Sequence, residues 1–174
     1  MPTDTTDEHS QFREYFAARR DTVRRTAYML CGDWHWADDL TQNAFMRLAV
    51  SWRKVNDRQA LDAFVRTCLV RAYFADLRRV WRRRERSVAS PPDVAVADGS
   101  SADRAAFLAA LRRLPPRQRA VLVCRYYQDL DVAATAQTLG CSPGTVRSQA
   151  ARGLDKLRAL LAENGELTRM EGRR

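Results

Sequence analysis

The sequence predicts an all-α protein of two small helical domains joined by a flexible linker. Apolar residues recur at helical spacing in both halves of the 174-residue chain, and no stretch shows the period-two alternation of a strand. Between the halves, residues 87–103 are rich in Ser, Pro, Ala and Asp and lack a helical period, which is typical of a linker. We therefore place the first domain at 10–86 and the second at 104–162.

The composition limits the partners and the compartment. The formal net charge is +9 and the isoelectric point is about 10.1, which favours a polyanionic partner such as nucleic acid. No apolar run approaches the roughly 18 residues of a membrane span, and the polar, acidic start MPTDTTDEHSQ is unlike a signal peptide. We therefore expect a cytoplasmic protein that does not insert into membranes.

The residues that commonly carry chemistry are scattered. Four cysteines and two histidines lie far apart without a C-x-x-C pair, so buried thiols are a better interpretation than a zinc site or a disulfide framework. The sequence also lacks a carboxylate cluster suited to two metals and a nucleophile with a nearby base. We therefore expect no metal, no cofactor and no enzymatic activity.

Four helices are predicted before the linker. They lie over 11–30, over 36–52 with one break, and over about 61–84. The apolar faces of the first two stretches hold Phe12, Tyr15, Phe16, Val23, Ala27 and Leu30, and then Ala37, Leu40, Ala44, Phe45, Leu48 and Trp52.

The last of these helices changes character along its length. Its first part, DAFVRTCLVRAYFADL, mixes apolar residues with aromatics, whereas its end, RRVWRRRER, is nearly all arginine. Basic side chains interleaved with Tyr73, Phe74 and Trp81 suit single-stranded nucleic acid, in which bases stack and phosphates pair. The alternative is a solvated helix end with its aromatics in the core, and for Trp81 the sequence does not choose between the two.

Two helices in the second domain predict a helix-turn-helix. The segment CSPGTVRSQAARGLDKLR starts a helix with Ser142 as N-cap and Pro143 at the first helical position. Upstream, LDVAATAQTLG predicts a shorter helix capped by Asp131, with Gly140 in the turn that follows. The second helix of such a motif enters the major groove of DNA.

The second helix of this motif has one apolar face and one polar face. Residues at helical spacing predict a buried stripe of Val146, Ala150, Gly153, Leu154, Leu157 and Leu161. The opposite face carries Arg147, Ser148, Ala151, Arg152 and Asp155. Its arginines suit phosphate or a guanine edge, and the small alanine permits close approach. An ordinary amphipathic hairpin with a solvated basic face is the alternative for this pattern taken alone.

Two segments resemble bacterial RNA polymerase sigma factors. DDLTQNAFMRLAVSW is similar to their region-2 helix, and LPPRQRAVLVCRYYQDLDVAATAQTLGCSPGTVRSQAARGLDKLR is similar to their region 4. The order of these regions and the linker resemble the extracytoplasmic-function (ECF, group 4) members of the sigma-70 family. The arginine- and tryptophan-rich segment resembles the sigma-E-like branch, and the resemblance covers about residues 10–161.

The resemblance implies a function and partners. A sigma factor binds core RNA polymerase, at its clamp helices and flap, and directs promoter-specific initiation by recognising −35 and −10 elements and assisting strand opening. Promoter DNA is the second implied partner, and an anti-sigma factor is a possible third. The alternative is a stand-alone helix-turn-helix regulator, which would not co-purify with polymerase.

The resemblance also implies roles for individual residues. The surface that docks on the clamp helices matches Asp38, Asp39, Gln42, Asn43 and Arg47. The part that captures the −10 element matches Asn56, Asp57, Arg58, Phe64, Arg71, Tyr73, Arg78, Arg79, Arg82 and Arg83. The part that recognises the −35 element matches Arg119, Arg125, Thr145, Arg147, Ser148 and Arg152.

Three features depart from the family pattern. Arg71 stands where many members have asparagine, and Ala150 and Ala151 stand where a larger residue often occurs. Trp34, His35 and Trp36 occupy a turn that is usually polar. For the two tryptophans we expect packing beneath the helix.

Overall fold

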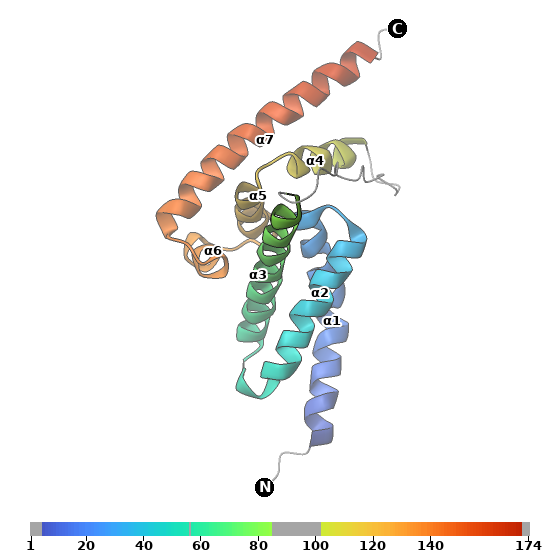
Figure 1. Ribbon diagram of the computed structural model, residues 1–174, viewed down its shortest axis with the longest axis vertical. Coiled ribbons are helices and arrows are strands. Elements are labelled where there is room, and N and C mark those ends of the chain that lie inside the picture. Colours follow the sequence, from blue (N-terminus) through green and yellow to red (C-terminus); the bar gives the residue numbers. More distant parts are fainter. Residues whose placement is uncertain (1–4, 56, 85–101, 172–174) are drawn as a thin grey trace. The chain divides into compact units, whose positions relative to one another are not determined.

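The computed structural model describes residues 5–55, 57–84 and 102–171, and every regular element in these ranges is helical (Figure 1). The chain divides into two compact units, residues 1–88 and 89–174. The predicted all-α class with two helical domains is therefore confirmed. Most of the predicted linker lies outside the described residues, but its last two positions, 102 and 103, already belong to a helix.

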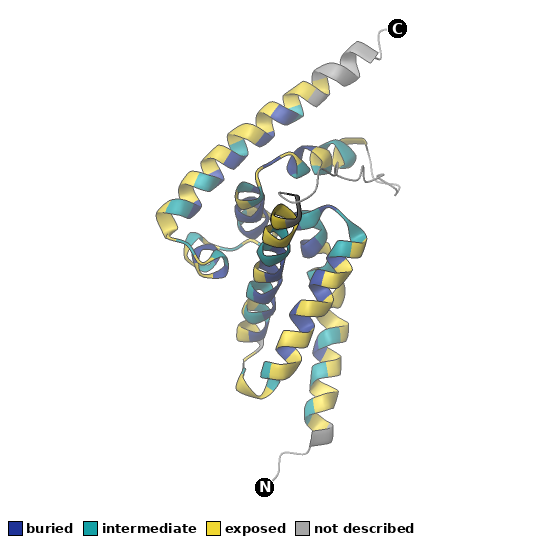
Figure 2. Cartoon of the chain, viewed as in Figure 1, coloured by how far each residue is buried: buried dark blue, intermediate teal, exposed yellow. Residues whose placement is uncertain are grey.

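The first unit consists of three long helices. They are α1 (Thr5–Cys31), α2 (Trp34–Ser51) and α3 (Arg58–Arg84), with the short 3₁₀ helix η1 (Trp52–Lys54) directly after α2. Helix α2 packs against both α1 and α3, and the predicted apolar face of α2 from Ala37 to Leu48 is buried (Figure 2). From α3, the core receives Leu61, Val65, Leu69, Val70, Ala72 and Tyr73.

The helices of this unit differ from the prediction at several points, and α1 begins at Thr5, six residues before the predicted start. The break expected within 36–52 is absent, because α2 is continuous and the chain tightens only at η1. Helix α2 starts at Trp34 because the Asp33 side chain caps it, accepting the Trp36 N–H at 2.7 Å. Helix α3 starts three residues early, where the Asp57 carbonyl accepts the Leu61 N–H at 2.9 Å.

A polar contact ties α1 to the start of α3. The Asp62 carboxylate accepts a hydrogen bond from the Tyr15 hydroxyl at 2.7 Å and another from the Arg19 guanidinium at 2.6 Å. Burial of the Tyr15 side chain raises the pKa of Tyr15 well above its usual value, and the hydrogen bond to Asp62 is the second-largest cause. The contact holds in place the first turns of α3, which follow residues 55–57 directly.

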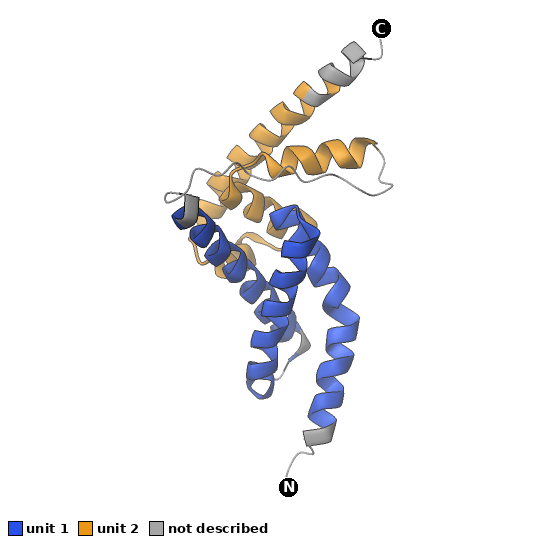
Figure 3. Ribbon diagram, turned by 45° about the vertical axis from the view of Figure 1, so that its right-hand side comes forward, with its two compact units in different colours: residues 1–88 blue, residues 89–174 orange. Residues whose placement is uncertain are grey.

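The second unit is built around its last helix (Figure 3). It contains α4 (Ala102–Arg112), α5 (Pro116–Leu122), the π-helical turn η2 (Val123–Tyr127), α6 (Val132–Leu139) and α7 (Pro143–Glu171). Helix α7 contacts α4, α5 and α6. Gly153 of α7 lies against α5, where an added Cβ would come within 3.2 Å of Leu122 Cγ.

The predicted helix-turn-helix is α6 and α7. The Asp131 side chain caps α6 by accepting the Ala134 N–H at 2.7 Å, and Ser142 Oγ accepts the Thr145 N–H at 3.1 Å to cap α7. Gly140 ends α6 with φ 63°, a conformation that favours glycine. The buried stripe of α7 is as predicted at Val146, Ala150, Gly153 and Leu157, whereas Leu154 and Leu161 are only half-buried and Leu160 is buried instead.

Candidate polymerase and DNA interfaces

The residues predicted to dock on polymerase share the exposed face of α2. Asp38, Asp39, Gln42, Asn43 and Arg47 are all exposed, whereas the opposite face of the helix lies in the core. Asn43 Oδ1 accepts the Arg47 Nε–H at 3.0 Å, so these two side chains support each other. The face is therefore accessible and polar.

Asp38 differs from its neighbours because it has an ion-pair partner. Its carboxylate pairs with the Arg24 guanidinium of α1, and this hydrogen bond lowers the pKa of Asp38. The guanidinium also lies over the Trp34 ring, 4.3 Å from its centroid. Trp34 in turn stacks on Tyr28 at 4.0 Å. Asp38 thus stabilises the α1–α2 hairpin, whereas Asp39 and Gln42 have no such contact among the described residues.

The two tryptophans of this turn pack as expected, and the histidine between them lies at the surface. Trp36 donates its Nε1–H to Asp76 of α3 at 3.0 Å and lies 5.6 Å from the Tyr73 ring. His35 is exposed. The turn therefore stabilises the packing of α3 on the hairpin.

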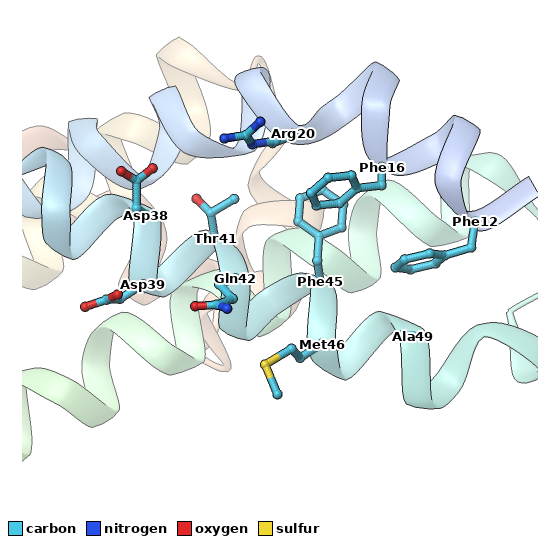
Figure 4. A pocket seen from close by; sticks show the side chains of 10 residues that line it. All are labelled: Phe12, Phe16, Arg20, Asp38, Asp39, Thr41, Gln42, Phe45, Met46 and Ala49. Carbon is cyan, nitrogen blue, oxygen red and sulfur yellow. The ribbon is translucent and has the colours of Figure 1, made fainter. Parts of the chain in front are cut away.

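A groove beside the polar face was not predicted. It has a volume of about 500 Å³ between α1 and α2, with aromatic walls from Phe12, Phe16 and Phe45 (Figure 4). Asp39, Gln42 and the exposed Met46 lie at its α2 side. Met46, an exposed apolar residue outside the buried face of α2, is the signal in the sequence that indicates this apolar surface.

A second groove, of about 510 Å³, lies between α2 and α3. It brings together Phe64 and Arg71, two of the residues predicted to capture the −10 element. Asn43 and Arg47 line its other side, so residues assigned to polymerase also border this groove. Cys68 lies in its lining, and burial raises the pKa of that thiol. The polar groups at the rim are mainly hydrogen-bond donors, which suits an acceptor-rich ligand.

The other −10 candidates have different environments. Asp57, Arg78, Arg79 and Arg82 are exposed. Asn56 lies outside the described residues, as do the side chains of Arg58 and Arg83.

The prediction that Tyr73 contacts the −10 element is wrong. Its side chain is only 1% exposed and packs between Trp36 and Phe74 in the core, so it does not offer a ring to a base.

In the second unit, the predicted reading face of α7 is accessible. Arg147, Ser148 and Arg152 are exposed, and Thr145 is half-buried at the start of the helix. Ser148 Oγ donates to the Thr145 carbonyl at 3.1 Å, which leaves the two guanidinium groups as the strongest donors on this face.

Arg119 is buried and serves the fold of the second unit, so the prediction that it contacts DNA is wrong. Arg119 is 9% exposed, and its guanidinium donates to the carbonyl of Arg112 and, at 3.1 Å, to that of Leu114. These carbonyls lie at and just after the end of α4, where helix ends leave acceptors without intrahelical partners. The Arg125 guanidinium donates to the Leu130 carbonyl, in the loop before α6, but Arg125 is only half-buried, so its contact with DNA stays a prediction.

Two features are absent from the part of the chain that the structure describes. Within it, no three His, Cys, Asp or Glu side chains come close enough to hold a metal ion. Likewise, none of the helices described is both long and apolar enough to cross a bilayer.

Comparison with known proteins gives matches to both units. The family model described as Sigma-70 region 2 matches residues 15–83, and that for Sigma-70, region 4 matches residues 104–157. The RNA polymerase sigma-E factor of Streptomyces avermitilis is 34% identical over 85% of this chain and 83% of its own length. The RNA polymerase sigma-E factor of Streptomyces coelicolor is 33% identical over 85% of this chain and 84% of its own length. The sigma factor RpoE of Bartonella quintana, solved with the anti-sigma factor NepR, has a TM-score of 0.77 at 24% identity, covering 87% of this chain and 97% of that one.

Proposed function

Because this chain belongs to the sigma-70 family and is a sigma factor that directs transcription initiation, we propose which of its surfaces carry out each step. Residues 10–86 act as region 2, which binds core polymerase and the −10 element. Residues 104–162 act as region 4, which binds the −35 element, and residues 87–103 tether the two regions.

Core polymerase docks on the exposed face of α2. The observation that carries this assignment is a polar set, Asp39, Gln42, Asn43 and Arg47, on a helix whose other face is buried. Beside it, the groove with its aromatic walls and Met46 offers an apolar contact, and protein interfaces combine apolar cores with polar rims. Asp38 contributes by fixing the hairpin through Arg24.

The groove between α2 and α3 captures a base of the −10 element. Phe64 offers an aromatic side chain, and Arg71 and Arg47 offer donors. Arg78, Arg79 and Arg82 then contact phosphates beyond the groove, because they are exposed and cationic. Guanidinium groups at the rim favour a base edge with acceptors, so Arg71 in place of asparagine shifts the −10 preference.

Helix α7 reads the −35 element from the major groove. Arg147 and Arg152 offer planar forks to base edges or phosphates, and exposed Ala151 lets the helix approach closely. Two small units on a 17-residue tether gain little from each other unless a third body sets their spacing. Core polymerase supplies that spacing.

An anti-sigma factor is a further proposed partner, because the Bartonella quintana sigma factor was solved in complex with one. It would act by covering a surface that polymerase needs, and competition between the two for this chain would demonstrate it.

Transcription in vitro tests the proposal. The purified chain, mixed with core polymerase and genomic fragments, should yield promoter-specific transcripts that neither component yields alone. A chain that binds DNA specifically but never co-purifies with core polymerase would instead be a stand-alone regulator.

A further inference from the structure

Trp81, near the end of α3, is the tryptophan of this chain that solvent reaches most. Its side chain is 68% exposed. Trp34, Trp36 and Trp52 are half-buried, and each packs on an aromatic ring of the first unit. Packing in the core therefore does not explain why residue 81 is a tryptophan. The side chains around Trp81 indicate what its exposed ring contacts.

Those surroundings are cationic. Arg78 lies three residues before Trp81, and Arg82 follows it directly; both arginines are exposed and, being four apart, are neighbours on the helix. Among the described residues, no acidic side chain pairs with either of them. Asp76 pairs instead with Arg79, at 3.7 Å. The Arg82 Nε–H donates to the Arg78 carbonyl at 3.3 Å, which leaves the positive charge of both guanidinium groups without a carboxylate among the described residues. An indole beside such groups complements a polyanion that also offers flat rings.

The same helix connects Trp81 with the groove between α2 and α3. Phe64, Arg71 and Arg78 are seven residues apart, a spacing of almost two turns that keeps them on one side of α3. At 1.5 Å per residue, Trp81 lies about 15 Å along the axis from Arg71. A strand of duplex DNA advances about 3.4 Å per nucleotide and an unpaired strand can extend further, so this separation corresponds to at most about four to five nucleotides.

We propose that Trp81 stacks on an unpaired base of single-stranded DNA while Arg78 and Arg82 contact the adjoining phosphates. The proposal rests on the proposed function, since promoter opening supplies the unpaired strand. It adds a contact at most about four to five nucleotides from the base held at Arg71. The contact tolerates any sequence, because every base has a π-face. A closed duplex does not offer that face, because its bases stack on one another.

Binding to a short oligothymidylate tests the contact directly. Adding it to the full chain should quench tryptophan fluorescence. The anisotropy of a labelled oligothymidylate, a signal that does not depend on Trp81, should show that Trp81→Ala weakens binding roughly 5- to 150-fold, the range expected for one stacked base. Trp81→Phe keeps a ring and should retain most of the affinity. Val80→Ala is the matched control, because it removes an apolar side chain, 39% exposed, from the same turn.

Salt dependence separates stacking from charge. Trp81→Ala should leave the slope of log affinity against log salt unchanged, whereas Arg78→Gln should reduce it by about 0.7. Unaltered affinity in Trp81→Ala would overturn the proposal. So would an equal loss on a duplex of the same length, or quenching by anionic phospholipid vesicles but not by the oligonucleotide.

Promoter opening distinguishes this proposal from the proposed function. With core polymerase, Trp81→Ala should open the promoter less than the wild-type chain does, while Val80→Ala should match the wild type. If Trp81→Ala opened it equally well, the stacking contact would be refuted and the proposed function would stand. If the wild-type chain supported no transcription, the proposed function would fail, and the oligonucleotide titration would still decide on Trp81.

Discussion

Removing the Asp62 carboxylate should destabilise the first unit, because this group joins α1 to the start of α3. It accepts hydrogen bonds from Tyr15 at 2.7 Å and from Arg19 at 2.6 Å. Phe64 lies two residues further along the helix, and residues 55–57 directly precede α3. The contact therefore holds the part of the unit to which −10 capture is assigned.

Two contributions of different size make up the cost of Asp62→Ala. The Tyr15 side chain is buried and its hydroxyl donates to a charged acceptor, a bond that contributes about 1.5–3 kcal/mol. The Arg19 and Asp62 side chains are 46% and 31% exposed, so water screens their ion pair to about 0.2–1 kcal/mol. We expect a total loss of about 2–4 kcal/mol, most of it from the hydroxyl.

Tryptophan fluorescence during urea unfolding measures this cost in the first unit alone, because all four tryptophans lie within residues 34–81. The free energy of unfolding should fall by about 2–4 kcal/mol in Asp62→Ala and by about 1.5–3 kcal/mol in Tyr15→Phe. The double variant should lose little more than Asp62→Ala does. Asp39→Ala, which removes an exposed carboxylate from α2, serves as the control and should stay within about 0.5 kcal/mol of wild type.

If the double variant lost the sum of the two single losses in unfolding free energy, the proposed coupling between Tyr15 and Asp62 would be refuted. A coupling energy below about 0.5 kcal/mol between the two substitutions would mean that the hydroxyl and carboxylate do not stabilise each other. The pH dependence gives a second check, because burial and the bond to Asp62 raise the pKa of Tyr15. The folded chain favours the neutral phenol, so this stabilisation is complete below about pH 10 and is lost as the pH rises through the folded pKa. The advantage of wild type over Tyr15→Phe should shrink only at alkaline pH.

Three predictions concern the proposed interfaces. Gln42→Ala combined with Asp39→Arg should weaken co-purification with core polymerase without changing tryptophan-monitored unfolding; unchanged co-purification would contradict the α2 assignment. Arg152→Ala should cost about 1–3 kcal/mol on the preferred −35 sequence if it contacts a base edge, measured by titration against altered sites, whereas an equal loss on all sequences would indicate a phosphate contact. Permanganate should modify thymines around −10 only when core polymerase is present, and Arg78→Glu with Arg79→Glu should abolish that reactivity; modification by the chain alone would contradict the polymerase-dependent mechanism.

The features that the sequence predicted well are those that depend on neighbouring residues. Asp131 and Ser142 cap their helices because each side chain reaches an N–H three residues later. The apolar face of α2 is buried because its spacing follows the helical period. Both signals lie within one turn or one face, so they need no knowledge of the rest of the fold.

The features that the sequence did not predict depend on contacts between helices. Arg119 is buried because carbonyls at the end of α4 need donors, and nothing adjacent to Arg119 in sequence indicates that need. The groove between α1 and α2 also requires two helices, since Phe12 and Phe16 come from one and Met46 from the other. Spacing within a single helix cannot reveal either arrangement.

The aromatic residues of α3 show how the fold divides a uniform sequence pattern into buried and exposed side chains. Tyr73 and Phe74 lie where α2 still covers the helix, and Trp36 reaches across from α2 to Tyr73 and to Asp76. Beyond Asp76 this cover ends, and residues 78–82 are all exposed. A ring buried as fully as that of Tyr73 is worth more to the core than to a ligand, because burying it removes a large apolar area from water. An exposed ring beyond this cover can contact DNA without loosening the unit. Base stacking on α3 is therefore expected at Trp81 and not at Tyr73, although both lie in the same arginine- and aromatic-rich helix.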